Sequence, residues 1–219
     1  AVVAHLPVAA TSFGEVGPRH APEALALSSL ERFGAKVFDE RSGVAYLYYR
    51  CRRHREAFVD LLLQAGLRVD ALGKCAGPLR PQRSGAFEAA RYGADWHGGA
   101  VEAYAASRFV VAFENAQEPG YVTEKMGLAF LAGAIPVYWG HAGSARDIFN
   151  ADAYVDCSTS LQACAARVRE LDVNRTEFLR VLSAPPLSAK GLGILRADSL
   201  SEALRPLALL LARQALRAL

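Results

Sequence analysis

From residue 44 onward, short apolar runs alternate with stretches whose apolar residues repeat at helical spacing. Five apolar runs have the β-branched, aromatic and small residues typical of buried strands: 44–49, 67–72, 109–113, 135–138 and 154–155. Five further stretches have a helical pattern: 53–64, 100–106, 124–132, 161–170 and 175–182. Gly66 and Gly133 follow two of these at the position where a left-handed residue ends a helix. The alternation predicts an α/β fold, a Rossmann-like parallel sheet with helices on both faces.

The regions on either side of this pattern are less regular. Residues 1–43 are rich in proline and glycine around one helical stretch at 23–33, and we interpret them as the remnant of an upstream domain or an interdomain linker. Residues 73–99 lack a sustained period, and a loop of that length is typically functional or mobile. Residues 187–219 form a C-terminal tail, in which leucines at helical spacing over 199–219 predict an amphipathic packing helix, or else a partner or membrane-surface helix.

Composition narrows the class of function. The 219 residues are 52% hydrophobic with a formal charge of +3, and their 25 basic residues are scattered, which disfavours a nucleic-acid track and suits a small anionic ligand. No uninterrupted apolar run reaches membrane-spanning length. Because the chain begins with Ala1, without a leader pattern, we expect it to be a fragment or processed form that lacks an upstream part.

The four cysteines do not have metal-binding spacing. Cys51, Cys75, Cys157 and Cys164 form no C-x-x-C pair, which disfavours a zinc site. Their even number permits two disulfides, and the sequon at 174–176 would fit a secretory compartment. Free buried thiols and a chance sequon are an equally weighted alternative.

The chemistry-bearing segment begins where an apolar strand ends. Residues 109–113 are followed at once by Glu114 and Asn115. In open α/β sheets ligands bind beyond the carboxyl ends of the strands, so both side chains should face the crevice. After a turn, Thr123 is placed to act as the N-cap of the next helix. The start of that helix would offer unpaired N–H groups to a phosphate.

Three more residues of this segment suit a nucleotide. Lys125 adds a full positive charge at the helix start, the ring of Tyr121 could cover a base or ribose, and Glu124 can accept hydrogen bonds from ribose hydroxyls. Taken singly, each has a simpler interpretation, because a Glu-Lys pair is most often a solvated first turn and a tyrosine often covers the core. The order of strand, Glu-Asn, turn, Tyr-x-Thr-Glu-Lys, helix and strand is much harder to obtain by chance.

These residues carry a resemblance to a known family. FEN at 113–115, YVTEK at 121–125 and AGAIPVYWG at 132–140 resemble the signature of the α1,3/α1,4-fucosyltransferases. Similarity extends to residues 46–55, to VDALGKC at 69–75 and onward to about residue 186, so it covers 44–186. The resemblance implies the C-terminal, GDP-fucose-binding half of an inverting transferase with the two-domain GT-B fold. The loop at 76–99 and the close after Phe178 depart from the family pattern.

Carried over residue by residue, the resemblance implies that Arg55 and Lys125 hold the pyrophosphate. It further implies that Asn115, Tyr121 and Glu124 contact the nucleoside, with Glu114 and Thr123 in support. His54 could also contact phosphate, although a solvated loop histidine is the preferred interpretation. A Cys51–Cys75 disulfide is plausible beside two neighbouring strands, whereas a local Cys157–Cys164 bond is disfavoured.

The resemblance and the chain's own chemistry agree that no cofactor or metal is expected. The departing diphosphate must be neutralised, and the chain lacks the Asp-x-Asp motif that holds a divalent metal in many transferases. The fixed cations Arg55 and Lys125, with the helix start at Thr123, provide the alternative. The general base is expected upstream in the acceptor domain, so the catalytic residue stays unidentified.

The predicted function is transfer of L-fucose from GDP-fucose to a glycan hydroxyl, α1,3 on N-acetylglucosamine, with inversion. Two alternatives stay open: a non-catalytic donor-binding module, and a GT-B transferase for another nucleotide sugar. The expected partners are GDP-fucose and a glycan or glycoprotein acceptor, not nucleic acid. The family implies a Golgi lumenal location, with a membrane anchor only in an upstream part.

Overall fold

The computed structural model describes residues 25–79 and 96–194, with side chains from residue 99 in the second range. The element order is α3 (Ser29–Phe33), α4 (Val37–Glu40), β1 (Val44–Tyr46), α5 (Arg53–Gln64), β2 (Val69–Ala71), α7 (Trp96–Tyr104), β3 (Phe109–Phe113), α8 (Lys125–Leu131), β4 (Ile135–Trp139), α9 (Ala142–Ile148), η1 (Ala151–Ala153), β5 (Val155–Asp156), α10 (Leu161–Val173) and α11 (Arg175–Ser183). Within these residues no helix is long and apolar enough to cross a bilayer.

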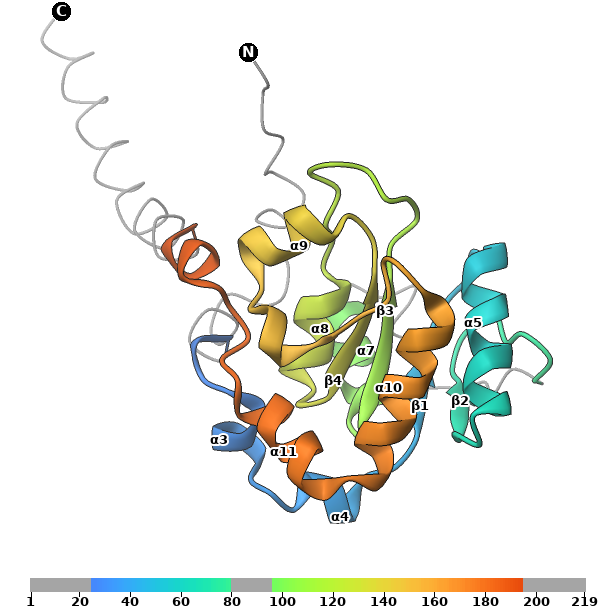
Figure 1. Cartoon of the computed structure of the whole chain (residues 1–219), viewed down its shortest axis with the longest axis horizontal. Coiled ribbons are helices and arrows are strands. Elements are labelled where there is room, and N and C mark those ends of the chain that lie inside the picture. The colour runs from blue at the N-terminus through green and yellow to red at the C-terminus, as the bar shows by residue number, and fades with distance from the viewer. Residues whose placement is uncertain (1–24, 80–95, 195–219) are drawn as a thin grey trace, which may run out of the picture.

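The sheet confirms the predicted fold class. Its five strands are all parallel, in the order β2-β1-β3-β4-β5. In Figure 1, α10 lies on the near side of the strands and α7 and α8 on the far side. The chain runs from β1 outward to β2 and then returns to place β3 on the opposite side of β1. The order of the strands therefore reverses between β1 and β3, which is where open α/β sheets open a crevice for ligands.

Strand β3 is the middle strand of the sheet, and every one of its five residues is buried. Phe109, Val111 and Phe113 point into a cluster with α5, α10 and α11, whereas Val110 packs among the residues of α7 and α8. Apolar side chains on both faces require helices on both faces, so the continuous apolar run of β3 is the sequence signal of a doubly covered strand.

Helix α5 begins and ends at the predicted residues, and Gly66 and Gly133 both have φ of 75° as their positions required. The strands at 44–49 and 67–72 are shorter than predicted, because the chain leaves the ladder at Tyr46 and Ala71. The helix predicted at 23–33 is interrupted, since α3 begins only at Ser29, after the capping box of Ser28.

The short helices α4 and α9 were not predicted. Residues 25–43 pack against the sheet domain: the Phe38 ring meets Phe178 edge-on at 5.3 Å, and Arg41 donates to the carbonyl of Ala132 at 2.7 Å. The predictions for residues 1–24, most of the 73–99 loop and the 199–219 helix lie outside the described residues.

Candidate functional site

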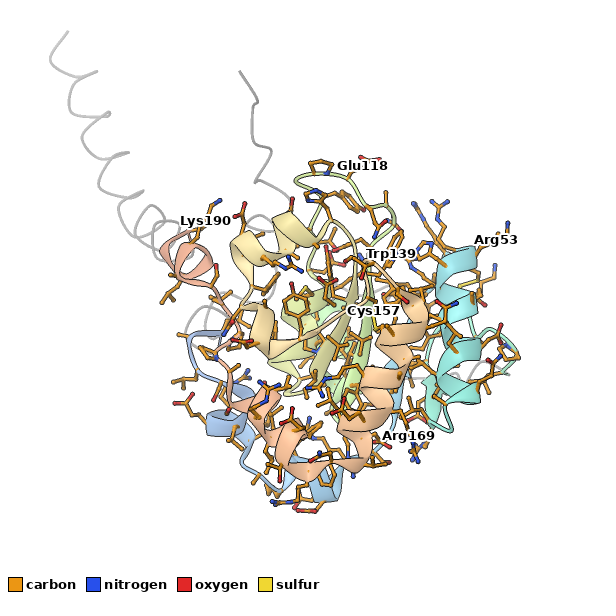
Figure 2. The ribbon with its side chains drawn as sticks, in the orientation of Figure 1. Arg53, Glu118, Trp139, Cys157, Arg169 and Lys190 are labelled. Atoms are coloured by element: carbon orange, nitrogen blue, oxygen red, sulfur yellow. A yellow bond between two sulfur atoms is a disulfide. The ribbon has the colours of Figure 1, made fainter. Side chains whose placement is uncertain are left out.

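A cavity of about 180 Å³ opens at the reversal of strand order, at the carboxyl ends of β1 and β3. It lies between the segment that follows β1 and the start of α8. In Figure 2, Arg53 at the start of α5 and Glu118 in the β3–α8 loop mark the same end of the molecule. The lining residues are Leu47, Tyr48, Tyr49, Arg50, Arg55, Tyr104, Asn115, Glu124, Lys125 and Leu128. Four of the five predicted donor residues, from three separate segments, thus meet at one cavity.

Arg55 lines this cavity from the first turn of α5 and is nearly completely buried, with 1% of its surface exposed. Its guanidinium donates to the carbonyls of Arg50 at 3.1 Å and Phe113 at 2.8 Å, and to Oδ1 of Asn115 at 3.0 Å. Its Nε atom is buried without a hydrogen-bond partner among the described residues. Arg55 therefore fastens α5 to the ends of β1 and β3 while it faces the cavity.

The aromatic ring of Tyr48 packs against the guanidinium of Arg55. The guanidinium carbon of Arg55 lies 4.0 Å from the centre of the Tyr48 ring, a cation–π distance. The Tyr48 hydroxyl accepts from the Phe113 amide at 2.6 Å and lies 2.9 Å from the Val111 carbonyl. Burial raises the pKa of this phenol well above its usual range, so it stays a neutral hydrogen-bonding group.

Glu114 is fully buried at the end of β3 and organises the loop that follows. Its carboxylate accepts from the Thr123 amide at 2.8 Å and from the Thr123 hydroxyl, and Lys125 Nζ lies 3.0 Å away. The prediction of Thr123 as the N-cap is wrong, because its hydroxyl is held by Glu114. Glu124 occupies the cap position of α8 and makes no side-chain cap bond.

The three residues predicted to contact the nucleoside differ in their relation to the cavity, because Asn115 and Glu124 line it and Tyr121 does not. Asn115 accepts from Arg55 through Oδ1 and donates through Nδ2 to the Tyr121 hydroxyl at 2.9 Å. Tyr121 does not line the cavity and is connected to it through Asn115. Glu124 lines the cavity, and its carboxylate lies 3.8 Å from Lys125 Nζ.

Residues 40–183 match the family model described as glycosyltransferase family 10 (fucosyltransferase), C-terminal. The chain belongs to this family. A protein of Acanthamoeba polyphaga mimivirus named as a fucosyltransferase is 35% identical over 149 residues, which is 64% of this chain and 23% of that protein. The α-(1,3)-fucosyltransferase 4 of Bos taurus is 40% identical over 82 residues, 36% of this chain and 21% of the relative.

Solved structures of the family share the fold. A crystal structure of an α1,3-fucosyltransferase with GDP-fucose superposes with a TM-score of 0.57 at 21% identity, covering 75% of this chain and 48% of that one. A second α1,3-fucosyltransferase structure gives a TM-score of 0.56 at 22% identity, with 73% and 44% covered. The chain thus spans about a quarter or less of the curated family relatives it matches and about half of these structures.

The sequence-based prediction of His54 as a solvated loop histidine is wrong. It lies in α5, and its ring stacks on Trp139 with centroids 4.0 Å apart. Its Nε2 lies 3.4 Å from the carbonyl of Glu114. Burial lowers the pKa of this imidazole, the contact with the Glu114 carbonyl opposes that shift, and the neighbouring charges of Arg55 and Arg52 lower the pKa further. Trp139 ends β4, so the stack connects α5 to the strand beyond β3.

Both cysteine pairs of this family member are disulfide-bonded. Cys51–Cys75 joins the segments after β1 and β2, as considered from the sequence. The Cys157–Cys164 bond was disfavoured, and that prediction is wrong, because the turn into α10 brings the two Cα atoms within 5.0 Å. One potential metal-ligand group occurs in the described part of the chain, Cys51, Cys75 and Glu56, but its two sulfurs are bonded to each other and are not available as thiolates.

Sequence reasoning missed Arg50 and Tyr48, although both line the cavity of this family domain. The signal was present, since both follow β1 within four residues, at the sheet edge where Glu114 and Asn115 were recognised. The prediction extended the strand to residue 49, which assigned Tyr48 to the sheet and left Arg50 without a role.

Proposed function

We propose that this domain binds GDP-fucose in the cavity at the β1–β3 reversal and serves in the transfer of L-fucose to a glycan hydroxyl. The observation that carries the proposal is the convergence of Arg55, Asn115, Glu124 and Lys125 on one cavity at the expected sheet edge. The names of the relatives, and the GDP-fucose in one structural neighbour, agree with this donor.

The residues divide into two ends of a nucleotide site. Arg55 and Lys125 provide positive charge for the diphosphate, and Asn115 and Glu124 provide amide and carboxylate groups for the nucleoside. Tyr121, which does not line the cavity, supports Asn115 by accepting a hydrogen bond from its amide. Glu114 and Thr123 hold the loop that carries these groups. Because fixed cations can balance the diphosphate, we propose catalysis without a bound metal.

In the proposed reaction an acceptor hydroxyl oxygen attacks C1 of fucose. The bond between C1 and the phosphate oxygen breaks, and GDP departs with the electron pair. A carboxylate base takes the acceptor proton, and attack from the face opposite the diphosphate inverts the anomeric centre. We place this base outside residues 44–186. We further propose an α1,3 linkage to N-acetylglucosamine and a Golgi lumenal setting, with any membrane anchor outside the domain.

Nucleotide-dependent thermal stabilisation tests donor binding. GDP should raise the melting temperature of the chain, UDP and ADP should not, and EDTA should leave the GDP effect unchanged. Glu124→Gln keeps the shape of the side chain but removes a charged acceptor, so GDP affinity should fall about 10-fold or more. Glu118→Gln, in the exposed part of the same loop, should bind like the parent chain.

Four outcomes would contradict parts of the proposal. Equal stabilisation by UDP would indicate another nucleotide sugar, and dependence on a divalent ion would contradict the metal-free mechanism. GDP binding with no fucose transfer, in a longer protein that contains this chain, would favour a donor-binding module. Transfer that yields the β-linked product would contradict inversion, since GDP-fucose carries its diphosphate in the β configuration.

A further inference from the structure

Arg50 lines the donor cavity with an exposed side chain on a firmly held backbone. Its carbonyl accepts from the Arg55 guanidinium at 3.1 Å, and the next residue, Cys51, is joined to Cys75 by a disulfide. Among residues 25–79 and 99–194, no hydrogen bond or ion pair engages the Arg50 guanidinium. The chain thus presents a free cation from a fixed position.

The other two cations at the cavity are already engaged. Lys125 Nζ lies 3.0 Å from a carboxylate oxygen of Glu114, 3.8 Å from Glu124 and 2.6 Å from the Thr123 hydroxyl. Three N–H groups of Arg55 donate to protein oxygens. Three cations and two carboxylates leave one surplus positive charge at the site, and both carboxylates lie near Lys125. Arg50 and Arg55 each lack an acidic partner among the described residues, but Arg55 already donates to three protein oxygens, whereas the Arg50 guanidinium has no such partner there.

The surplus positive charge suits the reaction described in the proposed function, and the inference rests on that function. As the bond from C1 to the phosphate oxygen breaks, the diphosphate gains negative charge that a neighbouring cation can stabilise. We propose that Arg50 binds the diphosphate of the donor and its leaving group, through the two-pronged hydrogen bonding that guanidinium makes to phosphate. Arg55 and Lys125 contribute positive charge from the cavity wall, and Arg50 adds a guanidinium that is not already bonded to the described protein groups.

An exposed arginine is most often only solvated, and two neighbours provide matched controls for that interpretation. Arg52 and Arg53 are also exposed, lie within three residues of Arg50 and do not line the cavity. A general electrostatic contribution would make the three arginines equivalent. A direct diphosphate contact would distinguish Arg50 from the other two.

The test is calorimetric titration of the chain and its Arg50→Gln, Arg50→Lys and Arg53→Gln variants with GDP, GMP and guanosine. Loss of a charge-assisted bond should weaken GDP binding about 10-fold or more in Arg50→Gln, and leave guanosine binding within about twofold. Arg50→Lys should fall between Arg50→Gln and the parent, because it keeps charge but loses the second prong. Arg53→Gln should match the parent.

Each other outcome overturns the inference in a recognisable way. Equal GDP affinity in Arg50→Gln and the parent removes the contact while leaving the proposed function in place. Equal losses in Arg50→Gln and Arg53→Gln indicate a general field, and equal losses for GDP and guanosine indicate a structural role. If the parent chain does not bind GDP, the proposed function fails and this inference fails with it. Unchanged melting temperatures of the unliganded variants show that each is folded.

Discussion

A carboxylate at the end of a fully buried strand requires partners of its own, because an isolated buried charge is costly. Glu114 has none of its surface exposed and directly follows β3. It obtains two hydrogen bonds from Thr123 and an ion pair from Lys125. All its partners belong to the loop and helix start that face the cavity. At the scale of single residues, Glu114 therefore positions the loop between β3 and α8.

This arrangement predicts a strong coupling between Glu114 and Lys125. Lys125→Met should reduce the free energy of unfolding by about 2–3 kcal/mol, since it leaves the buried carboxylate without its cation. The loss should be smaller than for a completely buried pair because Lys125 keeps 20% of its side chain exposed. In a Glu114→Gln background the same change should cost about 1–2 kcal/mol less. Urea denaturation of the four proteins measures the difference.

Lys36 provides the control for removing a lysine. Its ion pair with Glu40 is exposed, with 69% and 61% of the two side chains accessible. Lys36→Met should therefore change the free energy of unfolding by no more than about 0.5 kcal/mol. Additive effects of Glu114→Gln and Lys125→Met would contradict the role assigned to the buried pair.

At the scale of elements, the sequence predicted those that bury a continuous apolar face. Strand β3 and helix α5 begin and end where their periods do, because burial on both sides of β3 and on one side of α5 leaves few alternatives. The short helices α4 and α9 were missed, since 4 and 7 residues hold too few apolar positions to establish a period. The N-cap was also mispredicted, because the hydroxyl of Thr123 bonds to Glu114, nine residues earlier, and not to the helix that follows.

The candidate site, like the fold, was predicted only in part. Arg55, Asn115, Glu124 and Lys125 were recognised through a family pattern, and the fold brings them to one cavity. The sequence could not show that Arg55 and Lys125 are already engaged by protein groups, because those partners come from other elements. Nor could it show the stacking of His54 on Trp139, because these residues lie 85 positions apart in the sequence.

Two glycines that end helices allow the energetic cost of a tight packing contact to be separated from the cost of a strained backbone. Gly66 and Gly133 both have φ of 75°, where a side chain is strained, but only Gly133 has a neighbour in the way. A Cβ at Gly133 would overlap the Phe33 ring, which is also stacked against Arg32 and Arg41, whereas a Cβ at Gly66 would meet nothing.

Gly66→Ala should therefore cost about 1–2 kcal/mol of unfolding free energy from the left-handed backbone alone. Gly133→Ala should cost a further amount of about 1–3 kcal/mol from overpacking. Denaturant unfolding of both variants measures the difference, and Phe33→Ala should remove most of the additional cost in a double variant. Equal losses at the two glycines would show that α3 yields freely and does not fix the end of α8.

At the scale of the whole molecule, the carboxyl edge of the sheet is held together by contacts between distant elements. Arg55 connects α5 to the end of β3, the Cys51–Cys75 bond connects the segments after β1 and β2, and His54 connects α5 to Trp139 at the end of β4. The cavity thus lies on a scaffold whose parts come from four strands. Loss of one of these contacts should therefore lower the stability of the whole domain. Where a contact involves a titratable group, that stability should depend on pH.

His54 gives that dependence a definite sign. Burial lowers the pKa of its imidazole below the ordinary value of 6.5, so near that pH the unfolded chain binds more protons than the folded one. The contribution of a neutral, stacked His54 is therefore complete above pH 6.5 and is lost as pH falls below it toward the folded pKa.

The substitution His54→Phe tests this contribution, because phenylalanine keeps an aromatic ring against Trp139 but cannot be protonated. Its melting temperature should fall less than that of the parent between about pH 7.5 and 5.5, with parallel curves above about pH 7.5. Identical acid-side slopes, measured by thermal unfolding in matched buffers, would show that protonation of His54 does not weaken the scaffold.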